Sequence, residues 1–328
     1  MNRRKTTAAL IALACSLRPL RLLAQKQDSA PRVGLLILAS LASVTTIIEG
    51  FRTNLRDLGY VDGRSIQLEV LSAEGNDERL PGLAAQFVAR KVDIIITGGG
   101  NVSTIAARNA TSTIPIVMSG SLNAVEAGLV QSLARPGGNV TGLTTPLELG
   151  LKQLQLLKEL IPTLSRVALL VRHGQVTAQD MERATQLMQM ALGLTLQFVE
   201  VSSPADVPRA LAVVRAAKAE AMVVGGDPLL YQQREQIQAF ARAARIADMA
   251  PLQDMVEEGA LVSFGPAARE SFRGVARFVD RILKGAKPAE LPVEQPTIFE
   301  LAINLKTART LGLKVPQSML LRADRVIE

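Results

Sequence analysis

The stretch VDIIITGG, residues 92–99, contains a continuous apolar run at 94–96 and ends in glycines. Such a run is typical of a strand buried on both faces, as in a parallel sheet that helices cover on each side. A second stretch of the same design, EAMVVGG, occupies residues 220–226. Each stretch follows an earlier apolar run that opens with arginine and valine, at Arg32 and at Arg166. The two halves of the chain therefore repeat one plan.

From Pro31 onward, short apolar runs alternate with segments of helical periodicity, and this alternation predicts the α/β class. The expected strands include residues 33–38, 66–71, 92–96, 114–118, 166–171 and 299–303. The expected helices include residues 44–58, 80–90, 102–109, 151–160, 180–192, 228–245, 270–283 and 306–311.

We predict two Rossmann-like lobes with parallel sheets, joined by a hinge that the chain crosses several times. Residues 31–145 plus 266–293 would form lobe 1, and residues 146–265 plus 294–328 would form lobe 2. Turn-forming residues place the crossings within residues 135–142, 260–266 and 287–292.

Composition narrows the function classes. The chain has 328 residues, 48% of them hydrophobic, and no run of apolar residues long enough to span a bilayer. Its single cysteine, Cys15, and single histidine, His173, exclude an intramolecular disulfide and a Cys/His zinc site, so we predict no metal and no cofactor. Five of the seven net positive charges fall within residues 1–24, and there is no tryptophan. A nucleic-acid partner is therefore not expected.

The first 24 residues have the pattern of an export signal. Basic residues at 3–5 precede a short apolar stretch at 6–17, and cleavage is expected after Ala24. This pattern predicts a periplasmic protein. The alternatives are a frayed amphipathic helix of a cytosolic protein and a lipid anchor on Cys15, for which residues 12–15 form a weak lipobox.

Three long strings give the chain a family resemblance: SLARPGGNVTGLT at 132–144, LPVEQPT at 291–297 and FELAINLKTA at 299–308. They resemble the bacterial ABC-transporter substrate-binding family related to tryptophan- and tyrosine-binding proteins. The resemblance covers nearly the whole chain after the signal. It implies a periplasmic binding protein type I fold, in which two lobes close on a small molecule and deliver it to a membrane permease.

The sequence departs from that family at loop tips. Residues 119–123 are SGSLN where the family usually shows Gly-Asp-Pro, and residues 172–175 are RHGQ where it usually has a loop with Asn and Pro. Residues 250–252 lack an expected aromatic residue. Because such loops make the ligand contacts, the fold carries over and the identity of the ligand does not.

The first candidate binding element is the turn from Thr97 to Ser103. Its glycines Gly98, Gly99 and Gly100 permit close approach to free backbone N–H groups at a helix start, which suits a ligand carboxylate. The hydroxyls of Thr97 and Ser103 would be further donors. The alternative is an ordinary strand–helix turn with Asn101 as the N-cap. The glycine spacing matches no nucleotide fingerprint.

The second candidate element is Asp227, which follows the glycines at 225–226 and precedes Pro228. It is expected to be the N-cap of a helix, and its carboxylate could also accept from a ligand ammonium. Other loop-tip candidates for ligand binding follow strands: Ser40, Ser119, Arg172 and His173.

These features predict an exported solute-binding protein, not an enzyme, that acts as a monomer on a small organic ligand bearing a carboxylate or resembling an amino acid. One alternative is an α/β enzyme that uses His173 and Asp227 as acid–base residues. Another is the ligand-sensing domain of a transcription factor, although residues 1–30 are too short and too apolar for a DNA-binding helix-turn-helix.

Overall fold

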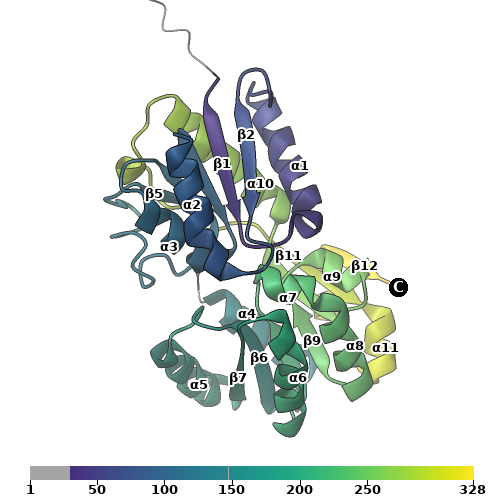
Figure 1. Ribbon diagram of the computed structural model, residues 1–328. Helices are drawn as coiled ribbons and strands as arrows, with labels where there is room; N and C mark the ends of the chain where they lie inside the picture. The colour runs from purple at the N-terminus through teal and green to yellow at the C-terminus, as the bar shows by residue number, and fades with distance from the viewer. Residues whose placement is uncertain (1–29, 147) are drawn as a thin grey trace, which may run out of the picture. The chain divides into compact units, whose positions relative to one another are not determined.

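The computed structural model describes residues 30–146 and 148–328, so the predicted signal at residues 1–24 lies outside the described residues. The first sheet has five parallel strands in the order β2-β1-β3-β4-β5 (Figure 1). Their bounds are β1 Arg32–Ile37, β2 Gln67–Ser72, β3 Ile94–Gly98, β4 Ile116–Leu122 and β5 Val140–Thr145.

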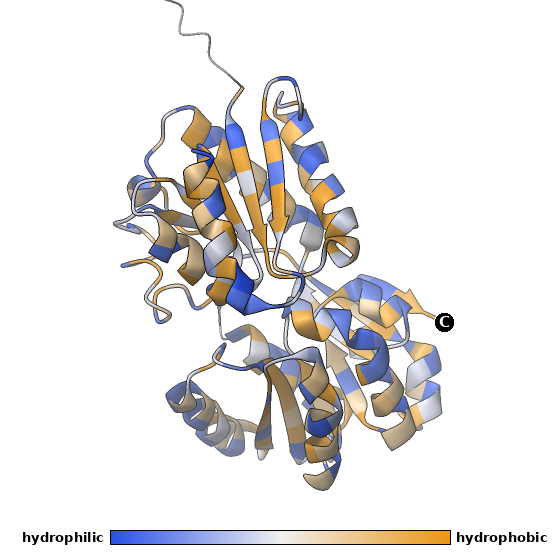
Figure 2. Ribbon diagram, in the orientation of Figure 1, coloured by the Kyte–Doolittle hydropathy of each residue, from blue (hydrophilic) through white to orange (hydrophobic). Residues whose placement is uncertain are grey.

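Helices cover both faces of this sheet, as the apolar runs predict. Helices α1 (Leu41–Asp57) and α10 (Ala268–Leu283) share one hydrophobic core with the strands. Helices α2 (Leu80–Ala89) and α3 (Gly100–Ala110) share the other. In Figure 2 hydrophobic colour predominates along β1 inside the sheet, whereas β2 at its edge and the helices carry polar residues as well.

The second sheet has seven strands in the order β12-β11-β10-β9-β8-β6-β7, parallel except for the pair β10 and β11. Their bounds are β6 Arg166–Arg172, β7 Thr195–Val201, β8 Ala221–Val224, β9 Ala247–Ala250, β10 Val262–Pro266, β11 Phe299–Asn304 and β12 Arg325–Ile327. The helices are α4 Glu148–Leu160, α5 Ala178–Leu192, α6 Val207–Ala216, α7 Pro228–Gln232, α8 Arg234–Ala244, α9 Gln253–Glu257, α11 Leu305–Leu311 and α12 Gln317–Leu320.

The two lobes repeat the same strand order. In the first sheet β1 lies between β2 and β3, and in the second β6 lies between β7 and β8. Strands β3 and β8, which carry the two matching sequence stretches, thus hold the same place in each series. The predicted α/β class with two lobes of parallel sheet is confirmed. Among the described residues, no helix combines the length and apolar content needed to cross a bilayer.

Two predicted crossings are wrong. Residues 140–142 begin β5 and pair with β4, so the chain leaves the first sheet only after Thr145. Residues 287–292 stay with the first lobe, since the carbonyl of Leu291 accepts from the Thr141 hydroxyl at 2.8 Å and Glu294 bridges Leu143. Turn-forming residues correctly predict loops at these positions, but they do not show which of the two sheets each loop belongs to. At the remaining predicted crossing, the chain leaves the second sheet after Pro266, the last residue of β10.

The single helix expected at 228–245 is also wrong, because the structure divides it into α7 and α8 at Gln233. The sequence holds no helix breaker there. Contacts with α9 coincide with the break: the Tyr231 hydroxyl donates to Asp254 at 2.6 Å, and Arg234 pairs with Glu258 at 2.6 Å. These contacts tie both sides of the break to α9.

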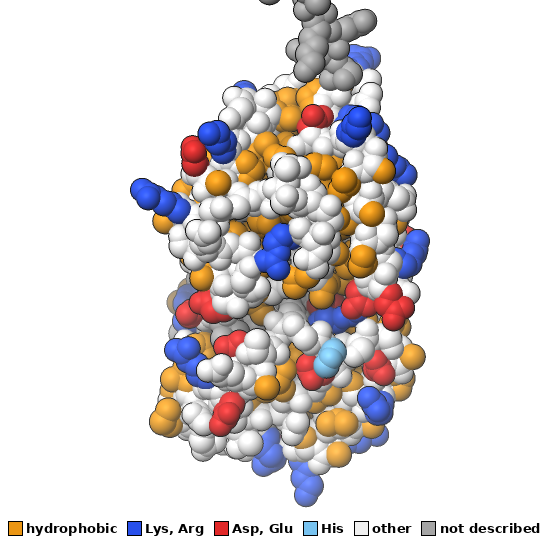
Figure 3. Space-filling model, turned by 60° about the vertical axis from the view of Figure 1, so that its left-hand side comes forward, with side chains coloured by type: hydrophobic (Ala, Val, Ile, Leu, Met, Phe, Trp, Pro, Cys, Tyr) orange, Lys and Arg blue, Asp and Glu red, His pale blue; other side chains and the backbone are white. Residues whose placement is uncertain are grey.

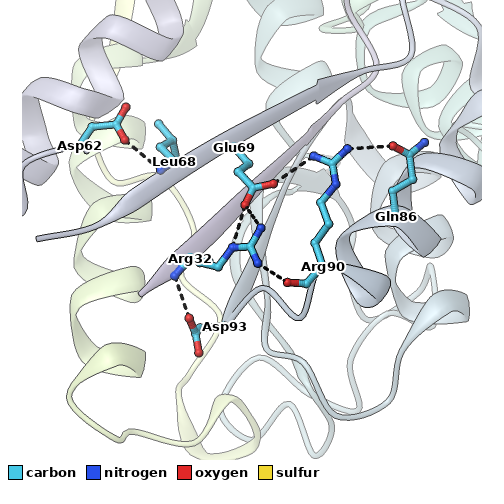
Figure 4. A network of polar contacts seen from close by, with 7 residues as sticks. All are labelled: Arg32, Asp62, Leu68, Glu69, Gln86, Arg90 and Asp93. Atoms are coloured by element: carbon cyan, nitrogen blue, oxygen red, sulfur yellow. Dashed lines mark hydrogen bonds and ion pairs between the residues drawn. The ribbon is translucent and has the colours of Figure 1, made fainter. Parts of the chain in front are cut away.

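A polar network closes the amino ends of β1, β2 and β3 (Figure 4). Nε of Arg32 donates to Glu69 at 2.9 Å, Arg90 pairs with the other Glu69 oxygen at 3.0 Å, and the backbone N–H of Arg32 donates to Asp93 at 2.7 Å. Burial alone would raise the pKa of Glu69, but the hydrogen bonds from the two arginines lower it below its ordinary value. The opposite, carboxyl ends of the strands are left for the candidate site.

Asp248 in β9 makes stability depend on pH. It is 3% exposed, its Oδ1 accepts from the backbone N–H of Leu261, and burial raises its pKa to about 6. Between its ordinary pKa and about pH 6 the folded state therefore holds more protons than the unfolded state, so stability is gained as the pH falls through that window. Relative to Asp248→Asn, which keeps the acceptor oxygen, we expect the wild type to gain up to about 1.4 kcal/mol per pH unit. Urea unfolding of both proteins between pH 7 and pH 5 measures this, and parallel curves would contradict it.

Candidate functional site

A cavity of about 320 Å³ lies between the two lobes. From the first lobe it is lined by residues that follow β4, among them Asn123 and Ala124, and from the second by residues of α4 and α5, among them Glu148 and Arg183. One ion pair also joins the lobes, because Nη2 of Arg172 lies 2.8 Å from Oδ2 of Asp77. The cavity thus lies at the carboxyl ends of β4 and β5 on the first-lobe side and against α4 and α5 on the second-lobe side. Carboxyl ends of strands are where α/β folds bind ligands.

The glycine turn joins β3 to α3, and the residues that line the cavity do not include it. Gly99 is the N-cap of α3 with a φ of 122°, and no side chain caps the helix there. A Cβ on Gly99 would come within 2.5 Å of the Leu38 Cβ, whereas a Cβ on Gly100 would meet nothing within 4 Å. The turn therefore needs glycine at 99 to pack and leaves open space at 100. Uncapped N–H groups at a helix start suit an anion.

Asn101 does not cap α3, which corrects the alternative interpretation of the turn. Its amide nitrogen donates to the Leu122 carbonyl at 3.0 Å, and its amide oxygen accepts from the Leu122 backbone N–H at 2.9 Å. Asn101 thereby fixes the start of α3 to the end of β4, next to the cavity-lining residues that follow Leu122.

The hydroxyls of Thr97 and Ser103 are turned into the lobe. Thr97 is 2% exposed and shares a 2.8 Å hydrogen bond with the Thr104 hydroxyl. Ser103 is fully buried and donates to the carbonyl of Gly98 at 3.1 Å. Both residues hold the turn in place, and the structure does not bring their hydroxyls to the cleft surface.

Ser40 follows β1, and Ser119 lies in β4. Both side chains are half-buried. Ser40 is the N-cap of α1 by position, yet its hydroxyl donates to the Ser43 hydroxyl at 3.1 Å instead of capping the helix. The Ser119 hydroxyl donates to the Thr97 carbonyl at 2.9 Å. Because each hydroxyl already donates its one proton, both stay candidates for ligand binding only as acceptors.

Arg172 is the last residue of β6 and is 2% exposed. Its Nη2 donates to Asp77, whose side chain is 44% exposed. Its Nη1 is buried and has no hydrogen-bond partner among the residues described. The cation is thus paired with Asp77, but its buried Nη1 group is unsatisfied, which is costly unless a ligand completes it.

Asp227 is 5% exposed and caps α7, since its Oδ1 accepts from the backbone N–H of Leu229 at 2.8 Å. The predicted N-cap is confirmed. Burial raises the pKa of the Asp227 carboxyl, while the Leu229 hydrogen bond and the positive charge of Arg172 oppose the rise. Asp227 and Arg172 therefore form one buried electrostatic unit at the carboxyl ends of β8 and β6.

His173 lies apart from this unit. Its side chain is 65% exposed and pairs with Glu200 at 3.2 Å, and the only histidine of the chain is visible at the surface in Figure 3. Within the described part of the chain, no hydrogen bond or ion pair joins His173 to Asp227. The structure thus does not bring together His173 and Asp227, the two residues of the alternative acid–base pair.

Sequence reasoning missed Asp77, Gln175 and Gln232. Asp77 begins the short 3-10 helix Asp77–Arg79 after β2, so the rule that loops following strands carry contacts could have found it. Gln175 Oε1 and Gln232 Nε2 are buried and, among the described residues, without a partner. Gln232 ends α7 and has no sequence signal of its own.

Comparisons with known proteins identify the family of the chain. The model of the family "ABC transporter substrate binding protein" matches residues 32–327. A tyrosine-binding protein of Clostridioides difficile is 28% identical over 294 residues, which cover 88% of this chain and 84% of that protein.

Two solved structures are similar as well. A conserved domain protein from Vibrio cholerae has a TM-score of 0.83 at 26% identity, over 91% of this chain and all of that one. The ABC domain from Streptococcus pneumoniae in complex with L-Trp has a TM-score of 0.80 at 25% identity, with the same coverage. The resemblance predicted from the three sequence strings is confirmed, and the chain belongs to the ABC transporter substrate-binding protein family.

Proposed function

We propose that this protein is the exported solute-binding component of an ABC uptake system and that it holds a zwitterionic, amino-acid-like ligand between its lobes. Family membership supports the role, and the names of relatives that bind tyrosine or L-Trp support the ligand class. A permease in the membrane would receive the ligand. The protein would act as a monomer, without nucleic acid and without a catalytic step.

The observation that carries this proposal is the buried carboxylate of Asp227 in the second lobe. It is 5% exposed and accepts backbone hydrogen bonds from Leu229 and Leu230 at the start of α7, and a ligand ammonium would use its remaining lone pairs. The uncapped N-terminus of α3 in the first lobe suits the ligand carboxylate. A zwitterion would then join the two lobes through its two charged ends.

Export is supported by the family and by the basic and apolar pattern of residues 1–24. The signal, its cleavage after Ala24 and the weak lipobox before Cys15 concern residues that the structure does not describe. Sequencing the amino terminus of the secreted chain tests this part of the proposal.

Ligand-driven closure tests the proposal as a whole. Small segments near residues 144–145 and 263–265 would absorb the motion while each lobe stays rigid. We expect small-angle scattering to record a smaller radius of gyration when an amino acid found by calorimetry saturates the protein. An unchanged radius at saturation would contradict a closing clamp, and a sugar that saturates the protein with the same closure would contradict the zwitterion.

A further inference from the structure

The second lobe presents three buried polar atoms that have no hydrogen-bond partner among the described residues: Nη1 of Arg172, Oε1 of Gln175 and Nε2 of Gln232. Arg172 is the last residue of β6, and Gln175 and Gln232 follow β6 and β8, which are neighbouring strands. Gln232 also reaches the first lobe, since a Cβ on Gly75 would lie 3.5 Å from its Oε1. These unused groups therefore gather on the cleft side of the second sheet.

Arg172 dominates this group because it carries a full charge. Its guanidinium pairs with Asp77 of the first lobe, so it lies where the two lobes meet, although it is not among the residues that line the 320 Å³ cavity. Asp77 is 44% exposed and its charge is screened by water, whereas Arg172 is 2% exposed. The ion pair with Asp77 thus compensates the buried cation only in part.

From this arrangement we infer that Arg172 selects a ligand with an acidic group on its side chain, so that the preferred ligand is an acidic amino acid. The inference rests on the proposed function, in which Asp227 takes the ligand ammonium. When the Asp227 carboxylate binds the ligand ammonium, Arg172 needs another buried negative charge as its partner. A side-chain carboxylate supplies it and accepts a hydrogen bond from the unused Nη1.

Geometry favours a carboxylate over a neutral acceptor. The guanidinium offers its free Nη1 next to an Nη2 that still has a second hydrogen, and a carboxylate can accept from both in the planar fork that arginine prefers. An amide would accept through one oxygen and turn its own N–H group toward the cation. An aromatic or aliphatic side chain would leave Nη1 buried and unsatisfied.

The test compares ligands and variants by titration calorimetry on the purified protein. The probes are glutamate, its amide glutamine, tyrosine, and succinate, a dicarboxylate without an ammonium. We expect glutamate to bind at least about 10-fold more tightly than glutamine, since a charge-assisted pair is roughly twice as strong as a neutral one. In Arg172→Gln we expect glutamate affinity to fall at least about 30-fold, the range for unpairing a buried charge.

Arg166→Gln is the matched control. Arg166 opens the same strand, β6, at its amino end, where it pairs with Glu220 at 2.7 Å and is 46% exposed. It removes the same charge away from the cleft and is expected to leave the preference for glutamate unchanged. Arg172→Lys keeps a positive charge beside Asp227 but loses the fork, so it should retain part of the preference. Circular dichroism on each variant checks that it folds.

The possible results separate the two claims. Tyrosine or glutamine binding as tightly as glutamate, with the same order in Arg172→Gln, would overturn the inference and leave the proposed function in place. Succinate binding that depends on Arg172, with no amino acid bound, would overturn the zwitterion and keep the role of Arg172. Binding of none of the four probes by a folded protein would overturn both.

Discussion

Replacing Asp227 by asparagine is expected to weaken the binding of a zwitterionic amino acid by about 2–5 kcal/mol, because the variant leaves the ligand ammonium in a closed cleft without a partner charge. This corresponds to a loss of roughly 30-fold or more in affinity. Stability should change little, since the asparagine oxygen can still accept from Leu229 and cap α7. Calorimetry gives the affinity and a thermal melt gives the stability.

Asp93→Asn is the control for this change. Asp93 also accepts from a backbone N–H, that of Arg32 at 2.7 Å, but it lies at the amino ends of the strands, away from the cleft. Its replacement should leave affinity unchanged. The direction of the pKa shift adds a second check: because burial raises the pKa of Asp227, wild-type binding should weaken with falling pH sooner than an ordinary carboxylate would allow. Unchanged affinity in Asp227→Asn would reduce Asp227 to a helix cap.

Replacing Gly99 by alanine is expected to destabilise the fold by about 2–5 kcal/mol, the sum of a strained backbone and an overpacked contact. The φ of 122° is one that residues with a Cβ rarely adopt, and the new Cβ would lie 2.5 Å from that of Leu38 and 2.9 Å from the Ser103 hydroxyl. Relief of these contacts must move the first turn of α3. Urea unfolding measures the loss of stability.

Gly100→Ala separates strain from packing. Gly100 also has a positive φ, 72°, but a Cβ there would meet nothing within 4 Å. We expect a loss of only about 1–2 kcal/mol, the cost of the left-handed conformation alone. Equal losses in the two variants would show that Leu38 does not constrain the turn.

Sequence patterns predicted the strands and helices well because the positions of apolar residues reflect which side chains are buried. The apolar runs at 92–96 and 220–224 are strands covered on both faces, and the Asp227-Pro228 pair starts a helix where local capping chemistry requires it. Such signals arise from neighbours in the chain or from a whole face of a sheet. A short window of the sequence around each element is therefore enough to recognise them.

The site was predicted less well because its contacts are specific and distant in sequence. Nothing in the local sequence of Arg172 indicates a partner at Asp77, 95 residues away, and nothing near Asn101 indicates that its amide binds Leu122. Thr97 and Ser103 were expected at the cleft because of their position after a strand. A short hydroxyl side chain can bond its own turn instead, and position does not decide between the two.

The placement of α10 has a consequence for the order in which the protein can mature. Helix α10 belongs to the core of the first sheet through Val275, Phe278 and Val279, yet the chain reaches it only after β10 of the second sheet. While the ribosome is still adding the second half, one face of the earlier half must therefore lack part of its covering. The amino-terminal half therefore cannot complete its hydrophobic core during synthesis. Most of the polypeptide has to leave the ribosome before either core is fully buried. Until then the nascent chain can be translocated in an unfolded state or bound by chaperones.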